Sequence, residues 1–245
     1  MKKIHVWVRA VIQLLYFLFI PSAYTAAFNG VKYIFTQMGA KTHLEVTSFV
    51  AALIVLCVYT IVFGRFFCGF ACAFGSLGDA VRALYVFICK KLKKKPITMK
   101  AAVVKKLKVV KYFVLAIIAV TCFTGVYSKA KGFSPWDVFS MLHARNFKLG
   151  GYTLGVVLLV LIVIGMCFQE RFFCRVLCPM GAVFSILPVL PFSTLRRDRS
   201  ECIKGCRACT MKCPSDIELA PDTAPELSGD CFQCQKCIDT CPKGN

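Results

Sequence analysis

The sequence RFFCGFACAFG at residues 65–75 ends a long apolar stretch, and RFFCRVLCPMG at residues 171–181 repeats it in the same setting. Each copy holds an arginine, two phenylalanines and two cysteines separated by three residues. Each also follows an apolar span and precedes an apolar segment that contains glycine. Because such self-similarity indicates an internal repeat, we predict two related halves, at about residues 1–89 and 105–192, within a domain of residues 1–199.

The composition indicates a membrane protein. Hydrophobic residues make up 58% of the 245 residues, more than the roughly 45–50% of ordinary soluble domains. A spanning helix needs about 17–25 apolar residues, and four stretches meet this need: Val6 to Tyr24, Val46 to Phe63, Val109 to Tyr127, and Gly151 to Phe168. We therefore predict an α-helical membrane protein with four transmembrane helices in two parallel repeats. Arg9 and Lys111, near the ends of their spans, are expected to reach the interface.

Charge predicts the orientation of these spans. The connector at residues 90–111 carries ten lysines, and the positive-inside rule places such a segment in the cytoplasm. Both termini are then cytoplasmic, with outer loops at 27–45 and 128–150. Residues 1–200 carry 26 basic and five acidic residues, a surplus that in so apolar a chain favours membrane lipid over nucleic acid as a partner. The expected location is the cytoplasmic (inner) membrane of a bacterium.

Two other topologies agree with parts of the sequence. The first span resembles a cleaved signal peptide, since MKK, an apolar core and SAYTAA fit that pattern, but Arg9 interrupts the core and cleavage would destroy the repeat. Residues Phe66 to Cys89 would serve as a fifth span only by moving the lysine-rich connector outside. We therefore expect this segment to be re-entrant or interfacial, packed against other helices that satisfy its backbone.

The repeat predicts a site shared by the two halves. A pseudo-two-fold axis along the membrane normal would bring the two cysteine pairs together at the cytoplasmic end of the bundle. Cysteines at i and i+4 share a helix face, and four thiolates suit an iron–sulfur cluster or a soft metal ion. The predicted ligands of this third site are Cys68, Cys72, Cys174 and Cys178.

Arg65 and Arg171 would offset the negative charge of these thiolates and raise the potential of the site. Reversible disulfides and plain packing of small buried side chains remain the alternatives for the two pairs. Packing is our interpretation of the cysteines without a pattern: Cys57, Cys89, Cys122 and Cys167.

The C-terminal residues 200–245 are predicted to form a bacterial-type ferredoxin domain with two [4Fe–4S] clusters. CFQCQKCIDTCP at 231–242 has the C-x2-C-x2-C-x3-C-P spacing in which the fourth cysteine ligates the other cluster. The partner motif is CIKGCRACTMKCP at 202–214, with one residue more than usual between its first two cysteines. Zinc ribbons fit this spacing less well. The crossover predicts two ligand sets: Cys202, Cys206, Cys209 and Cys241, and Cys231, Cys234, Cys237 and Cys213.

Several functions are not indicated. The three histidines, His5, His43 and His143, do not face each other within spans as haem b ligands would, so no haem is expected. No phosphate-binding glycine loop or dinucleotide fingerprint occurs. ATP hydrolysis and hydride transfer from a nicotinamide are accordingly not expected of this chain.

With four spans, duplicated RFFCxxxC elements and a two-cluster tail, the chain resembles the polyferredoxin family. This family includes NapH-type quinol dehydrogenase subunits and the membrane parts of NosR-like and CcoG-like proteins. Its motif is C-x-x-x-C-P, and here only the second copy has the proline, Pro179, where the first has Ala73. The resemblance implies an electron-transfer subunit of a membrane oxidoreductase that works with redox partner subunits, with quinol as a candidate donor. The alternative that it implies is a copper reductase or maturation factor for a respiratory metalloenzyme.

Overall fold

The computed structural model describes residues 4–19, 23–99, 101–128, 131–147, 150–190, 194–196, 202–203, 205–217 and 228–242. All regular elements within these ranges are helical, so the predicted helical class is confirmed. The predicted domain boundary at residues 199–200 lies outside them.

The first half contains five helices in its described residues: α1 (Ile4–Phe19), α2 (Ala23–Ala40), α3 (Ser48–Phe63), α4 (Phe66–Phe70) and α5 (Ala73–Lys91). The second half contains eight elements in its described residues: α6 (Ala101–Leu107), α7 (Val110–Phe123), η1 (Val126–Ser128), η2 (Lys131–Phe133), α8 (Pro135–His143), α9 (Thr153–Phe168), η3 (Phe173–Leu177) and α10 (Pro179–Ile186). The tail adds α11 (Ala208–Lys212) and α12 (Lys236–Thr240).

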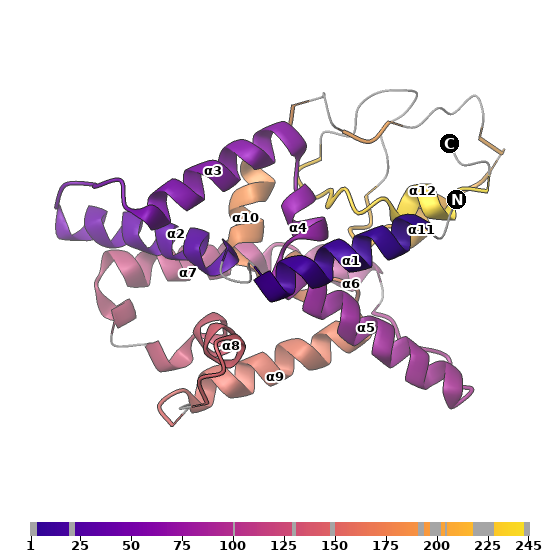
Figure 1. The fold of residues 1–245 in the computed structure, drawn as a ribbon, viewed down its shortest axis with the longest axis horizontal. Helices are drawn as coiled ribbons and strands as arrows, with labels where there is room; N and C mark the ends of the chain where they lie inside the picture. Colours follow the sequence, from indigo (N-terminus) through magenta and orange to yellow (C-terminus); the bar gives the residue numbers. More distant parts are fainter. Residues whose placement is uncertain are drawn as a thin grey trace.

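The two halves share their packing pattern (Figure 1). Helix α2 packs against α3 as α8 packs against α9, and α1 packs against α5 as α7 packs against α10. The tail lies beside α4 and α1, far from the turn that joins α2 to α3. The tail therefore meets the halves where their cysteine segments are.

The chain turns sharply before each cysteine pair. Helix α3 ends at Gly64, whose φ of +62° is readily adopted by glycine. In the second half the positive φ falls one position later, on Arg171 at +56°, where a side chain makes it less favourable. The segments that follow differ too, since α4 is an α-helix while η3 is a single π turn.

The second cysteine of each pair begins a helix. Cys72 is the N-cap of α5 and Cys178 is the N-cap of α10. Pro179 occupies the first turn of α10, where its missing N–H costs nothing and its fixed φ favours the helix. Ala73 serves at the same place in α5, so the departure from the C-x-x-x-C-P pattern does not change which element follows the cysteine.

The core joins the two halves. Phe74 of the first half stacks on Phe173 of the second, with ring centroids 4.4 Å apart, and the tilted rings of Trp136 and Phe28 have centroids 5.5 Å apart. All four rings are at most 9% exposed. Burial of each such side chain contributes about 1.5–3 kcal/mol, so these contacts help to hold the two halves together.

The expected outer loops contain helices. Most of residues 27–45 belongs to α2, which buries Tyr24, Ala27, Phe28 and Val31 on one face. A helix was not predicted there, because polar residues on the other face of α2 lower its hydropathy below that of a span. Part of the second loop forms α8, which begins at Ser134, whose hydroxyl accepts from the Asp137 N–H.

In the described residues, no helix by itself has the length and apolar composition to span a membrane. Helices α1 and α2 meet that requirement only together, as a pair bent by 61°. Helices α3 and α9 are apolar but shorter.

Candidate metal centres

The structure brings the two predicted cysteine pairs together in the core. Cys68 and Cys174 lie in α4 and η3, and Cys72 and Cys178 begin α5 and α10. Each is at most 7% exposed, and the thiols are close enough to interact electrostatically across the two halves. The result is one buried cluster of sulfur atoms to which each half contributes two.

This cluster lies in a positive electrostatic environment. The N-termini of α5 and α10 both meet it, and a helix N-terminus carries a partial positive charge that favours thiolate. The Gly181 N–H donates to the Cys178 sulfur at 3.1 Å, and the Tyr24 hydroxyl lies 3.8 Å from the same sulfur. The site therefore supplies groups that stabilise negative charge on sulfur.

The two predicted arginines are buried beside this cluster, and each reaches into the opposite half. Arg171 donates to the carbonyl oxygen of Cys68 and, at 2.9 Å, to that of Gly69. Arg65 donates to the carbonyl oxygen of Gly181 at 3.1 Å. Each arginine is 1% exposed. Their crossing fixes the two cysteine segments relative to each other.

Glycine is required where each arginine crosses. A Cβ on Gly75 would lie 2.6 Å from Arg171 Nη1 and 2.8 Å from the Cys68 carbonyl oxygen. A Cβ on Gly181 would lie 2.8 Å from Arg65 Nη2 and 2.9 Å from the carbonyl oxygen of Cys174. The two glycines thus have the same role in their halves.

A carboxylate completes the polar group around Arg171. Asp79 of α5 accepts from Arg171 Nε at 3.2 Å and from Gln13 Nε2 at 2.9 Å, and it also pairs with Arg9. Gln13 donates in addition to the Gly69 carbonyl at 3.2 Å. Arg9 therefore points inward, and the expectation that it reaches the interface was wrong.

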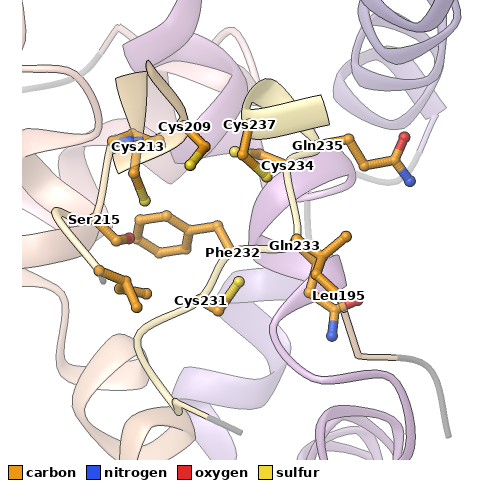
Figure 2. A pocket seen from close by; sticks show the side chains of 12 residues that line it. Leu195, Cys209, Cys213, Ser215, Cys231, Phe232, Gln233, Cys234, Gln235 and Cys237 are labelled. Carbon is orange, nitrogen blue, oxygen red and sulfur yellow. The ribbon is translucent and has the colours of Figure 1, made fainter. Parts of the chain in front are cut away.

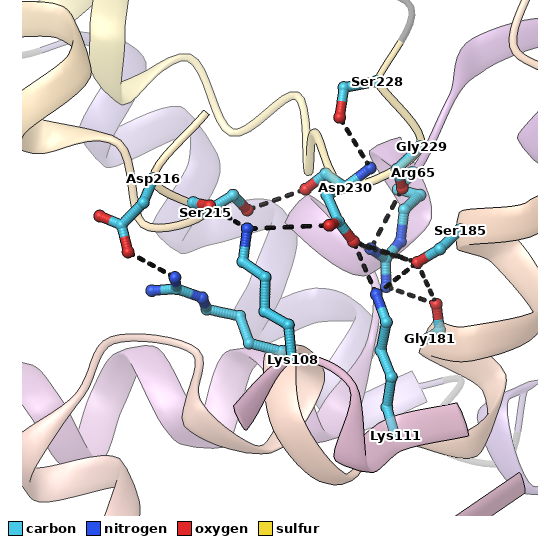
Figure 3. A network of polar contacts seen from close by, with 11 residues as sticks. Arg65, Lys108, Lys111, Gly181, Ser185, Ser215, Asp216, Ser228, Gly229 and Asp230 are labelled. Atoms are coloured by element: carbon cyan, nitrogen blue, oxygen red, sulfur yellow. Dashed lines mark hydrogen bonds and ion pairs between the residues drawn. The ribbon is translucent and has the colours of Figure 1, made fainter. Parts of the chain in front are cut away.

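The corresponding group around Arg65 takes its carboxylate from the tail (Figure 3). Asp230 Oδ1 lies 2.6 Å from Lys111 Nζ, 3.1 Å from Ser185 Oγ and 3.4 Å from Arg65 Nη1. Its other oxygen lies 3.7 Å from Lys108 Nζ. Lys111 is 1% exposed, so the expectation that it reaches the interface was wrong as well.

Burial by itself would raise the pKa of Asp230. The hydrogen bond from Lys111 and the charges of Lys111, Arg65 and Lys108 outweigh that effect and lower the pKa to about 2. This carboxylate is therefore ionised at neutral pH, as a counter-ion for buried cations must be.

Two residues after Asp230, the tail places an aromatic ring between the two arginines. The Phe232 ring centroid lies 4.8 Å from Arg65 Cζ and 5.6 Å from Arg171 Cζ. Phe232 is 2% exposed. Its carbonyl oxygen packs so closely on Gly69 of α4 that a Cβ there would overlap it. The loop with Cys231 and Cys234 is thus seated next to the core cysteines.

The tail cysteines surround two cavities. The first, shown in Figure 2, is lined by Cys209, Cys213, Cys231, Cys234 and Cys237. The second is lined by Cys202, Cys206, Cys209, Cys237 and Cys241. Each cavity includes all four members of one predicted ligand set, together with one cysteine of the other set. Among the described residues, no three His, Cys, Asp or Glu side chains converge in the manner of ligands around a single ion.

The donor set fits iron–sulfur clusters. Burial raises the pKa of Cys231 to about 12 and that of Cys237 to about 11, so these thiols hold their protons at neutral pH. Binding of a metal centre displaces the protons and supplies the missing positive charge. Cysteine thiolates at this spacing are the ligands that [4Fe–4S] clusters use.

The charged partners Asp79, Asp230 and Lys111 and the aromatic Phe232 were not identified from the sequence as site residues. One signal was present, because residues 1–200 contain only five acidic residues and Asp79 is alone within an otherwise apolar segment. The tail residues gave no such signal, since Asp230 is one of seven acids there.

Comparison with known proteins agrees with this chemistry. The signature of a family described as a 4Fe–4S binding domain matches residues 46–96 and 152–190, which contain both core cysteine pairs. An uncharacterized protein of Methanocaldococcus jannaschii is 33% identical over 191 residues, covering 78% of this chain and 67% of the relative. No solved structure gives a match of comparable significance.

Two named relatives extend the comparison. The ferredoxin-type protein NapH of Haemophilus influenzae is 25% identical over 213 residues, covering 82% of this chain and 68% of NapH. Protein NirI of Paracoccus denitrificans is 30% identical over 185 residues, 72% of this chain but 25% of NirI. The class is thus an iron–sulfur electron-transfer protein. Within that class, the chain belongs to the family of ferredoxin-type proteins that includes NapH, NirI and NosR.

Proposed function

We propose that the protein is the electron-transfer subunit of a membrane oxidoreductase, which accepts electrons from quinol or a cytoplasmic donor and passes them to a partner redox protein. The observation that carries this proposal is the seating of the tail on the core. Phe232 lines the first tail cavity, its ring lies near Arg65 and Arg171, and its carbonyl oxygen packs against Gly69, next to Cys68. Cofactors held by the tail cysteines and the core cysteines would be neighbours within one rigid structure.

The proposed cofactors are two [4Fe–4S] clusters in the tail and a third centre at the core cysteines. The tail clusters would use the crossover sets, Cys202, Cys206, Cys209 and Cys241 for one and Cys231, Cys234, Cys237 and Cys213 for the other. When bound, the clusters would supply one-electron chemistry. The chain's own contribution would be to hold them, to exclude water from the core centre, and to raise its potential through Arg65 and Arg171.

Membrane insertion is supported by the apolar surface of three helices. Large exposed side chains lie along α3, α7 and α9: Phe49, Ile54, Val55 and Val58; Phe113, Ile117 and Val120; and Val157, Val160, Leu161 and Ile164. In water such surfaces would promote association, whereas lipid would cover them. We infer four spans with the lysine-rich connector, both termini and the tail in the cytoplasm.

A cavity between α1 and α5 is the place where we infer that quinol binds. Its volume is about 800 Å³, within the range of small-ligand sites. Its lining combines polar side chains, among them Arg9, Gln13 and Asp79, with apolar ones such as Phe17 and Phe87. Arg9 is 8% exposed and its Nε–H has no partner. An amphipathic ring with oxygen substituents matches this mixed lining, and Gln13 connects the cavity to Gly69, next to Cys68.

The first test is the iron and sulfide content with EPR spectra of anaerobically purified protein, wild type against Cys68→Ser/Cys174→Ser. We expect wild type to hold more than the about eight irons of two cubes, and the double variant to lose only the excess. Equal iron contents with unchanged spectra would mean that the core cysteines hold no cluster.

A second candidate function has one observation in its favour, since four buried thiols from two halves also suit Cu(I). The protein would then be a copper reductase or maturation factor. Stoichiometric Cu(I) binding that requires the core cysteines and leaves the tail clusters intact would select this function. Reduction of the tail clusters by a soluble quinol analogue, lost when Gln13→Leu alters the α1–α5 cavity, would select the first.

A further inference from the structure

The two halves use different residues at one corresponding position. Asp79 follows Arg65 by fourteen residues, and Ser185 follows Arg171 by the same number. Both lie on the helix that begins at the second cysteine of the pair, α5 or α10. Each faces the arginine of the opposite half, since Asp79 bonds Arg171 and Ser185 Oγ lies 3.3 Å from Arg65 Nη1. The repeat therefore has a carboxylate in one half where the other half has a hydroxyl.

The basic partners correspond as well. Arg9 of α1 pairs with Asp79, and Lys111 of α7 donates to Ser185 Oγ at 2.7 Å. Helix α1 packs on α5 as α7 packs on α10, so these two cations hold equivalent places. Each half thus surrounds this position with an arginine from the other half and a cation from one of its own helices, α1 or α7.

Only the first half balances these charges with a residue of its own. In the second half Arg65 and Lys111, each 1% exposed, meet a serine, which cannot neutralise them. The carboxylate of Asp230 enters between them from the tail, 2.6 Å from Lys111 Nζ and 3.1 Å from Ser185 Oγ (Figure 3). Desolvated cations without a counter-ion are strongly unfavourable, so the second half is incomplete without the tail.

We propose that Asp230 is a positioning residue that substitutes for the acid missing from α10 and thereby docks the tail at a fixed place on the two halves. Its neighbours in sequence make the docking specific. The Gly229 carbonyl accepts from Arg65 Nη1 at 3.2 Å, Cys231 is the next residue, and Phe232 fills the space between the arginines. The contact that neutralises Arg65 and Lys111 therefore also places the Cys231–Cys237 loop against the core cysteines.

Comparison of the two halves suggests a variant that separates docking of the tail from neutralisation of Arg65 and Lys111. In Asp230→Ser the buried cations lose their counter-ion and the tail loses its contact. In Ser185→Asp/Asp230→Ser the carboxylate returns on α10, at the place that Asp79 holds on α5, but it is no longer attached to the tail. Glu170→Gln is the matched control, because it removes another ion pair between the tail and the second half, Lys236–Glu170, whose side chains are 31% and 37% exposed.

The measurement is amide hydrogen exchange of the intact, cluster-loaded protein in detergent, followed for residues 229–237 and for α7 and α10. In Asp230→Ser we expect exchange at least about tenfold faster in all three segments. In the double variant we expect α7 and α10 to return to within about threefold of wild type while residues 229–237 stay at least about tenfold faster. Glu170→Gln should raise exchange in residues 229–237 by no more than about fivefold and leave α7 and α10 unchanged.

Either of two results would overturn the proposal. One is wild-type protection of residues 229–237 in Asp230→Ser, and the other is recovery of that protection in the double variant, which would reduce Asp230 to a counter-ion. Iron content, measured for every variant, identifies any that has lost a cluster. Asp230→Glu, which keeps the charge, should then recover both iron and protection. These readouts do not depend on the electron donor, so a failure of the quinol proposal would leave them unchanged.

Discussion

The two halves of this molecule place their cysteines alike but treat the tail differently. The first half neutralises its charges internally through Asp79 and presents the bare backbone of Gly69 to Phe232. The second half has Ser185 and Arg175 at the corresponding positions, and both meet carboxylates of the tail, Asp230 and Asp216. The two halves thus contribute equally to the cysteine site but differently to the surface on which the tail docks. The first half offers close packing at Gly69, and the second offers polar and charged side chains.

The largest effect should come from breaking the internal charge group of the first half. Asp79→Asn leaves Arg171 and Arg9 buried without a carboxylate, and removal of one partner from a buried pair costs about 3–5 kcal/mol. We expect a severe loss of thermal stability in detergent, measured by unfolding monitored with circular dichroism. Asp137→Asn, which removes the more exposed pair with Lys32, is the control and should cost less than about 1 kcal/mol. Similar losses in both variants would refute the distinction between buried and exposed pairs.

A smaller and equal effect is expected at the two arginine crossings. Gly75→Ala and Gly181→Ala each bring a Cβ within 3 Å of an arginine nitrogen and a carbonyl oxygen, and such overpacking costs about 1–3 kcal/mol. Similar decreases in the unfolding temperature would support equivalent roles in the two halves. Gly78→Ala is the matched control on α5, because the atoms nearest to a Cβ there belong to Met166, at 3.7 Å. We expect this variant to leave the stability of the protein unchanged or to raise it by up to about 1 kcal/mol. A large loss in only one of the two crossing variants would show that the repeat is not maintained in the core.

The cysteine cluster was predictable because its pattern is local and repeated. Two copies of RFFCxxxC, each after a long apolar stretch, required only that the two halves pack symmetrically for Cys68, Cys72, Cys174 and Cys178 to meet. The tail motif carried its information in spacing, and the two cavities contain the expected cysteines. Both predictions depend on the spacing of cysteines along the sequence.

The charge groups were not predictable, because they depend on which segments pack together. Arg9 and Lys111 near the ends of apolar stretches gave no sign of their partners, and lipid headgroups were an equally good destination for them. The contacts of Asp230 could not be predicted, because they depend on a fold that brings the tail back to α10. Helix α2 was not predicted for a related reason. Only one of its faces is buried, and the polar residues on its other face give it a lower mean hydropathy than a membrane-spanning helix.

The smallest effect should come from the exposed pair that links α12 to the second half. Lys236 Nζ lies 2.6 Å from Glu170 Oε2, but about a third of each side chain is in contact with solvent. Water and salt screen such a pair, and its contribution is about 0–1 kcal/mol. In Lys236→Ala we therefore expect amide exchange in residues 229–237 to rise by no more than about fivefold at low ionic strength. At about 1 M salt, where the screening length falls to about 3 Å, the difference from wild type should disappear. The Asp230→Ser change should persist there, because its cations are buried. If Lys236→Ala released the tail as fully as Asp230→Ser does, docking would depend on the sum of surface charges, and the asymmetry between Ser185 and Asp79 would lose its significance.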